Sequence, residues 1–233
     1  MKKKILVTGG DGRFSKILKK ENKFLSFIFK SKKECNILDI KSIIKSIKST
    51  KASIILHCAG LSRPMSIHET NISKSIDLNI IGTANVVKAC EKFGIKLIYL
   101  SSGYVYNGTK GNYSEKDGVK PFNNYGWSKL GGECSAIMYK NSLVLRVTMT
   151  EKPFKFKSAY TNLISNFMYH EDLVKMLPKL LNKRGIINIG GKTQSVYKFV
   201  KADNSKIKKS KLKRNSKLPL LQSMNLSRLK KII

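Results

Sequence analysis

The chain begins with a short apolar run at 4–8 that leads directly into a glycine turn, TGGDGRFS at 8–15. Glycine lets the backbone turn tightly and approach a bound group closely. A helix that begins after such a turn offers free N–H groups and a partial positive charge to a phosphate. We therefore expect a dinucleotide cofactor, with its pyrophosphate at this turn, to contact four residues: Gly9, Gly12, Arg13 and Phe14. A glycine pattern alone is weak evidence, because ordinary strand-to-helix turns also contain it.

Strand-like and helix-like segments alternate after this turn. Apolar runs typical of buried strands occupy 24–29, 53–57, 96–101 and 143–147. Apolar residues at helical spacing occupy 13–20, 39–49, 73–93 and 125–139. The alternation predicts an α/β fold, a doubly wound parallel sheet of the Rossmann type with helices on both faces. Its ligand crevice lies beyond the carboxyl ends of the strands, where the glycine turn, the loop at 58–60 and Ser102 all fall.

The chain after residue 150 follows a different pattern. Residues 153–169 are irregular and aromatic, a helix is expected at 171–181, and a strand is expected at 186–189. The basic stretch at 198–217 is expected to be a mobile surface segment. We predict an NAD(P)-binding domain at 1–150 and a small, shortened C-terminal substrate lobe at 151–233, whose helix and strand pack back on the first domain.

The formal net charge is +32, from 46 Lys and Arg against 14 Asp and Glu. The basic residues are spread along the chain without a recognition motif, so we expect no specific nucleic-acid partner. Such a field still attracts anionic ligands. The four isolated cysteines predict neither a metal site nor a disulfide framework. No apolar run reaches the ~18 residues of a membrane span, and the N-terminal run is too short for a secretion signal, so a cytoplasmic protein is expected.

The second strand-like run ends in basic residues, KSKK at 30–33. A site that prefers NAD usually has an acid here, which binds the ribose hydroxyls. Basic residues suit a 2′-phosphate instead, so Lys30 and Ser31 favour NADP(H). In a chain this rich in lysine, NAD(H) stays open.

Tyr125 and Lys129 are one helical turn apart on a predicted helix, and they follow a strand-like run that ends in Ser101-Ser102. A Tyr-x-x-x-Lys pair alone is common. In this order it resembles the Ser/Tyr/Lys active site of the short-chain dehydrogenases/reductases. The YVYNG turn at 104–108 and the YGWSKLGGE stretch at 125–133 are similar to the extended members, and most to the dTDP-4-dehydrorhamnose reductase (RmlD-like) branch.

This resemblance implies the roles of the site residues. Tyr125 would protonate a substrate carbonyl oxygen as hydride arrives, and Ser102 would hydrogen-bond the same oxygen. Lys129 would lower the pKa of Tyr125 and hold the nicotinamide ribose. Gly103 and Tyr104 would contact a nucleotide-sugar substrate. Further cofactor contacts are implied at Asp39, Ile40, Cys58, Ala59, Gly60 and Asn79.

The resemblance also narrows the reaction. Nucleotide-sugar 4,6-dehydratases carry Asp-Glu after the catalytic Ser or Thr, whereas this chain has Gly103-Tyr104, so we predict a reductase of a 4-keto nucleotide sugar. The reductases often have Asp at position 103, so a 4-epimerase with bound NAD stays open, as do a non-catalytic dinucleotide-binding protein and a homodimer. Arg146 would pair with a substrate phosphate or form an internal salt bridge.

Overall fold

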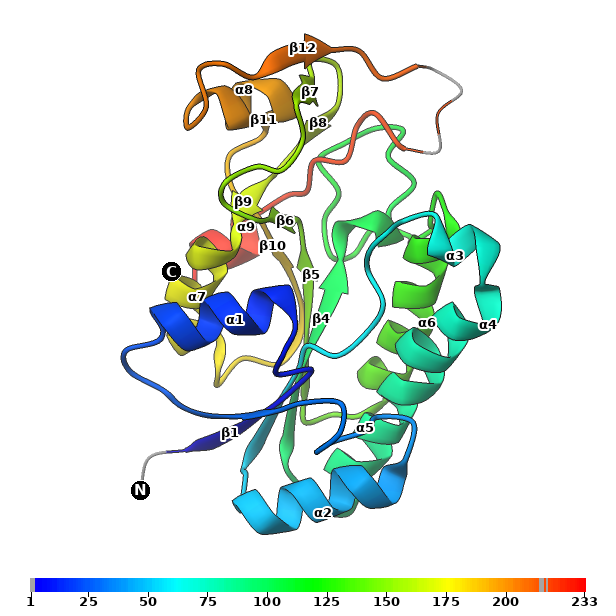
Figure 1. Cartoon of the computed structure of the whole chain (residues 1–233), viewed down its shortest axis with the longest axis vertical. Coiled ribbons are helices and arrows are strands. Elements are labelled where there is room, and N and C mark those ends of the chain that lie inside the picture. Colours follow the sequence, from blue (N-terminus) through cyan, green and yellow to red (C-terminus); the bar gives the residue numbers. More distant parts are fainter. Residues whose placement is uncertain (1–2, 214–215, 217) are drawn as a thin grey trace.

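A six-stranded sheet forms the centre of the computed structural model, which describes residues 3–213, 216 and 218–233 (Figure 1). Its strand order is β10-β5-β4-β3-β1-β2, and every neighbouring pair is parallel. The chain passes from β1 to β2 and then crosses to β3 on the other side of β1, so the switch point lies at the carboxyl ends of β1 and β3. This confirms the predicted doubly wound α/β fold. The strands are β1 (Lys4–Thr8), β2 (Ser26–Lys30), β3 (Ile54–His57), β4 (Lys96–Ser102), β5 (Ser142–Val147) and β10 (Gly185–Ile189).

Helices cover both faces of this sheet (Figure 1). On one face Ile5 and Val7 of β1 share an apolar cluster with Leu18, and on the other Leu6 shares a cluster with Ile43 and Val86. A sheet buried on both faces needs near-continuous apolar strands, which explains the runs in the sequence. The first face carries α1 (Arg13–Glu21) and α7 (His170–Leu180), and the second carries α2 (Ile40–Thr50), α5 (Gly82–Lys92) and α6 (Asn124–Met138).

The helical segment predicted at 73–93 is interrupted by a π-helical turn. The chain runs through α3 (Ile67–Thr70) and α4 (Ile72–Ile76), then η1 (Asp77–Ile81), and continues directly into α5. Asn79 lies in η1 and is buried. Gly132 of α6 packs against this turn so closely that a Cβ there would lie 2.3 Å from the Asn79 carbonyl oxygen. Single π turns inside α-helices occur frequently at functional sites.

A smaller lobe lies beyond the carboxyl ends of the main strands (Figure 1). Leu163, Val196, Val200 and Ile207 form its apolar core. The chain then returns to the main sheet, where Met224 and Leu229 are buried. The 3-10 turn η2 (Gly103–Val105) follows β4, and α9 (Ser227–Lys230) lies beside β10. The remaining elements are β6 (Met149–Thr150), β7 (Ser158–Tyr160), β8 (Ile164–Ser165), β9 (Met168–Tyr169), β11 (Gln194–Ser195), α8 (Val196–Lys201) and β12 (Lys208–Ser210).

The part of the chain after residue 150 is thus divided between two places. Helices α7 and α9 and strand β10 belong to the main sheet and its helical layer, and residues between Phe154 and Leu220 outside α7 and β10 contribute the core of the lobe. The basic stretch at 198–217 contains most of α8 and all of β12, while 214, 215 and 217 lie outside the described residues. Its mobility stays a prediction. Among the helices described, none is both long and apolar enough to cross a membrane.

Candidate active site

The glycine turn after β1 forms a cradle at the switch point. Gly9 has a φ of 67°, and a Cβ there would lie 2.7 Å from the Ala59 Cα, so the turn packs directly on the loop after β3. The Gly12 N–H donates to the Gly9 carbonyl at 2.9 Å. In the described structure no side chain caps α1 and no acid lies in its first turn. The N–H groups at this helix start fit a pyrophosphate. The Phe14 side chain lies in the core instead, with its ring edge-on to His170.

The end of β2 lies against this cradle, since the Gly10 N–H donates to the Lys30 carbonyl at 2.7 Å. Lys30 and Ser31 do not stand free there. The Glu34 carboxylate accepts from Lys30 Nζ at 3.1 Å, from the Ser31 N–H at 2.9 Å and from Ser31 Oγ at 2.8 Å. These donors hold the pKa of Glu34 down to about 2. Lys30 and Ser31, which are predicted to bind a 2′-phosphate, therefore already donate to the carboxylate of Glu34.

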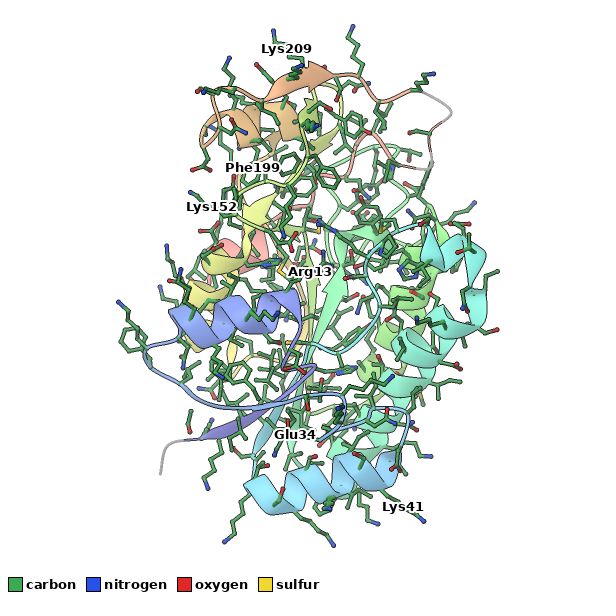
Figure 2. The ribbon with its side chains drawn as sticks, viewed as in Figure 1. Arg13, Glu34, Lys41, Lys152, Phe199 and Lys209 are labelled. Carbon is green, nitrogen blue, oxygen red and sulfur yellow. The ribbon has the colours of Figure 1, made fainter. Side chains whose placement is uncertain are left out.

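A cluster of charges joins the glycine turn to the lobe. Glu151 lies 3.7 Å from Arg13 Nε and 2.9 Å from Arg63 Nη1. Arg13 also donates to Ser62 Oγ at 2.8 Å, and it is the first residue of α1 (Figure 2). Sequence reasoning missed Arg63 and Glu151. Arg63 could have been noticed because arginine is scarce in this lysine-rich chain. A guanidinium group is favoured over an ammonium group where one side chain must bind two acceptors at once.

Asn79 holds the loop after β3 in place. Its Oδ1 accepts from the Leu61 N–H at 2.7 Å, and its Nδ2 donates to the Leu61 carbonyl at 2.9 Å and to Ser128 Oγ at 2.8 Å. A Cβ at Gly60 would lie 2.8 Å from Asn79 Oδ1. A contact of Asn79 with the cofactor stays a prediction. Its amide is used internally, and the loop that it fixes lies beside the cradle.

The other positions predicted around the cofactor lie at two sites. Cys58 and Ala59 lie in the loop after β3, and burial raises the pKa of the Cys58 thiol to about 12, so the thiol stays neutral. Asp39 is the N-cap of α2, where its carboxylate accepts from the Lys41 N–H at 2.9 Å, and Ile40 begins that helix. A contact of Asp39 or Ile40 with adenine stays a prediction.

Ser102, Tyr125 and Lys129 meet beside this loop. Ser102 ends β4, Tyr125 lies in the first turn of α6, and Lys129 follows one turn later. Burial raises the pKa of Tyr125, while a hydrogen bond with the Ser102 side chain and the charges of Arg63 and Arg13 oppose that rise. Burial lowers the pKa of Lys129 to about 7, against the opposing charges of Glu133 and Cys58. The hydroxyl, the phenol and the buried ammonium group thus come from two elements in contact, β4 and α6.

Aromatic rings enclose the Tyr125 phenol. The Tyr104 ring lies edge-on at 5.6 Å, and the His68 ring lies 5.0 Å away on another element, α3. Burial raises the pKa of Tyr104 to about 12. Gly103 has no room for the aspartate common at this position, because a Cβ there would lie 2.7 Å from Thr148 Oγ1. His68 carried no recognisable signal in the sequence, because its place beside Tyr125 depends on the path of α3.

Arg146 does not reach the crevice, and this corrects its predicted contact with a substrate phosphate. Its Nη2 lies 2.6 Å from Glu133 Oε1, and its Nη1 donates to Tyr106 Oη at 2.6 Å. Ser101 donates to the second oxygen of Glu133 at 2.5 Å. Arg146 and Glu133 are both buried, so the internal salt bridge is the alternative that holds.

The sequence of this chain matches a known protein family and several curated proteins. The family model of the RmlD substrate binding domain matches residues 2–165. Methionine adenosyltransferase 2 subunit beta of Danio rerio is 33% identical over 159 residues, which are 62% of this chain and 47% of that protein. The spore coat polysaccharide biosynthesis protein SpsK of Bacillus subtilis (strain 168) is 30% identical over 150 residues, 62% of this chain and 52% of that protein. The chain thus matches about half the length of these curated relatives.

A solved structure agrees over nearly the whole chain. The dTDP-4-dehydrorhamnose reductase of Bacillus anthracis str. Ames, solved in complex with NADP, superposes with a TM-score of 0.85 at 23% identity. The superposition covers 99% of this chain and 92% of that one, which establishes a shared fold. Since the family model covers well over half of its residues, this chain belongs to the RmlD substrate binding domain family.

Proposed function

We propose that this protein is an NADP(H)-dependent reductase of a 4-keto nucleotide sugar. The observation that carries the proposal is the interaction of the Ser102 side chain with the Tyr125 phenol, which opposes the rise that burial causes in the pKa of that phenol, with Lys129 one helical turn away. This group lies beside a glycine cradle that fits a pyrophosphate. The family match supports it, as does the likeness in fold to a reductase solved with NADP.

The cofactor would lie across the switch point. Gly9, Gly12 and the N-terminus of α1 would hold its pyrophosphate, with Arg13 beside them, and Lys129 would hold the nicotinamide ribose. When bound, NADPH supplies the hydride that adds to the carbonyl carbon. The basic residues at 30–33 favour NADP(H), whereas Glu34, which follows them and accepts from the Ser31 N–H, favours the alternative, NAD(H).

The chain's own groups complete the reduction of the carbonyl. The Tyr125 phenol donates its proton to the carbonyl oxygen, which becomes the hydroxyl of the product, and solvent later restores that proton. Ser102 Oγ donates a hydrogen bond to the same oxygen and fixes its position. The Lys129 ammonium and the arginines at the crevice favour the phenolate that Tyr125 becomes. The rings of Tyr104 and His68 pack against the Tyr125 ring.

The substrate phosphates would lie at the charged mouth of the crevice. Arg13, Arg63 and Lys155 gather there around Glu151, with Lys155 Nζ 4.0 Å from that carboxylate. The nucleoside diphosphate part of a nucleotide sugar has two anionic phosphate groups that such a cluster can bind. The lobe lies next to this cluster, so the nucleoside would contact it.

Replacement of the phenol tests the proposed reaction. With NADPH and a panel of 4-keto nucleotide sugars, Tyr125→Phe should lower kcat by about 10²- to 10⁴-fold, since that is the usual contribution of a general acid. The affinity for NADPH should change little. Tyr139→Phe is the matched control, because Tyr139 lies just beyond the far end of α6 and donates to the Ile95 carbonyl. Full turnover in Tyr125→Phe would contradict the proposed role, and sugar isomers that interconvert without net oxidation of NADPH would indicate the epimerase.

A second candidate is a dinucleotide-binding subunit without turnover. The curated relative at 33% identity is named as a subunit of methionine adenosyltransferase, and it matches a larger part of this chain than of itself. This candidate predicts that NADPH binds while no member of the panel is reduced. It also predicts that the protein elutes together with a methionine adenosyltransferase catalytic subunit in size-exclusion chromatography.

We also propose a cytoplasmic homodimer. All four cysteines are free in the described structure, which suits a reducing compartment. Ile72, Trp127 and Met138, which are 54%, 52% and 86% exposed, lie on helices α4 and α6, which are in contact. Sedimentation of the full chain at several concentrations tests the dimer, and a monomer at all of them would contradict it.

A further inference from the structure

We propose that Tyr99 is a positioning residue for Lys129, whose ammonium its ring holds in the crevice. Lys129 Nζ lies 4.3 Å from the centroid of the Tyr99 ring. The Tyr99 hydroxyl also donates to the Lys129 backbone carbonyl at 3.2 Å, so one side chain contacts both ends of the residue. The catalytic meaning of this contact rests on the role proposed above for Lys129.

The surroundings leave the ring as the main partner of this ammonium. Lys129 is 8% exposed, and no hydrogen bond or ion pair of Nζ occurs in the part of the chain that the structure describes. Glu133 lies one turn further along α6, but its carboxylate is paired with Arg146 and Ser101. A buried ammonium without a bonded partner is costly, and the face of an aromatic ring lowers that cost.

The strand pattern and one histidine fix the ring in place. Tyr99 is fully buried in β4 on the face that α6 covers, together with Ser101 two residues later. The His57 ring stacks on it, with centroids 5.7 Å apart and planes at 27°. His57 in turn shares hydrogen bonds with Thr8 and Thr83. These contacts hold the ring in one orientation.

Several titratable groups face Lys129, and each acts differently. Cys58 and Tyr125 are held neutral by burial, which raises the pKa of both. Burial lowers the pKa of His57 to about 3, so this histidine adds no second positive charge near neutral pH. His68 is also shifted toward its neutral form, because burial lowers its pKa. Glu133 contributes a negative charge. The Tyr99 ring is the group whose electron density can be changed with little change in charge or shape.

Stepwise fluorination of the ring tests the proposal. Fluorine withdraws electron density from the ring face and leaves its outline nearly unchanged, so Tyr99→Phe followed by mono-, di- and trifluorophenylalanine at the same position should weaken the attraction in steps. The readout is the pKa of Lys129, followed by NMR of lysine labelled with ¹³C at Cε in the full chain. The signal of Lys129 is identified by its loss in Lys129→Met.

We expect Tyr99→Phe to shift the pKa of Lys129 little, because phenylalanine keeps the ring face. The fluorinated series should then lower it by about one pH unit in total. The descending limb of the pH profile of kcat should move to lower pH by the same amount. The matched control is the same fluorination at Phe93, which packs on the same apolar cluster and should leave the pKa of Lys129 unchanged.

The outcomes separate this inference from the proposed function, because the pKa is measured without substrate. A pKa of Lys129 that stays constant across a series of folded variants overturns the inference, whether or not the protein reduces a nucleotide sugar. A pKa that falls in steps supports it. A falling pKa in a protein that never oxidises NADPH would overturn the proposed reductase alone.

Discussion

At the scale of single residues, Glu34 changes the expectation for cofactor preference. The basic stretch at 30–33 favours a 2′-phosphate on charge alone, but charge counted along the sequence does not show which groups are already paired. The Glu34 carboxylate already accepts hydrogen bonds from the Lys30 ammonium and from the N–H and hydroxyl groups of Ser31. A 2′-phosphate would have to displace this carboxylate, whereas a ribose hydroxyl could donate to it.

Glu34→Gln should therefore favour NADP(H). The neutral amide repels a phosphate less, so the ratio of the NADP⁺ to the NAD⁺ affinity should rise, by about fivefold or less for an exposed group. Titration calorimetry with both cofactors measures this ratio. Glu21→Gln is the control, because its carboxylate pairs with a lysine, Lys20, at the end of α1. A ratio that falls in Glu34→Gln would mean that the carboxylate helps to hold the 2′-phosphate.

At the scale of elements, close contact between α6 and the π turn η1 determines where the catalytic helix lies. Gly132 allows this contact, since an added Cβ would meet the Asn79 carbonyl at 2.3 Å and Tyr99 Oη at 2.7 Å. Gly132→Ala should lower the free energy of unfolding by about 1–3 kcal/mol, because overpacking outweighs the better helix propensity of alanine. Urea unfolding measures it. Gly118→Ala is the control, because Gly118 has open space around its Cβ position. If Gly132→Ala and Gly118→Ala were equally stable, α6 and η1 would be able to move apart without lowering the free energy of unfolding.

The Glu133–Arg146 pair joins α6 to β5 underneath the crevice. Both side chains are buried, with 0% and 4% of their surface exposed. Arg146→Met should lower the free energy of unfolding by about 3–5 kcal/mol, because it leaves the Glu133 charge unpaired. Arg146→Met combined with Glu133→Leu should recover much of that loss, since no unpaired charge remains. Urea unfolding of the two single variants and the double variant gives the coupling, and strictly additive losses would contradict it.

At the scale of the whole molecule, the sequence predicts what depends on local pattern. Apolar runs alternating with helical periodicity predict the sheet, and the glycine turn with Ser102, Tyr125 and Lys129 predicts where the candidate site lies. Contacts between distant segments could not be predicted. Arg63 and Glu151 are 88 residues apart, and Asn79 and Ser128 are 49 apart. Such pairs depend on how the elements pack, which is why the sequence leaves open whether Arg146 binds a phosphate or an internal carboxylate and does not predict the internal hydrogen bonds of Asn79.

Acid should destabilise the whole molecule through its histidines. The chain has three, and His57, His68 and His170 are all buried in the described structure. Burial lowers the pKa of His57 to about 3 and of His170 to about 4, and it lowers the pKa of His68 as well. In the unfolded chain these groups titrate near pH 6.5. Between those values the unfolded chain binds more protons than the folded one, so stability is lost as the pH falls from about 6.5.

His57 and His170 give the loss a predicted size. With two extra protons bound on unfolding, the free energy of unfolding should fall by up to about 3 kcal/mol for each pH unit between roughly pH 6 and pH 4, and His68 acts in the same direction. Repulsion within a chain of net charge +32 acts in the same direction and should weaken as salt screens it. Urea unfolding at pH 7, 6 and 5 and fixed salt measures the slope. His170→Phe, next to the Phe14 ring, should remove up to about half of it. An equal stability at pH 7 and pH 5 would mean that these histidines become protonated in the folded protein without cost, which their burial contradicts.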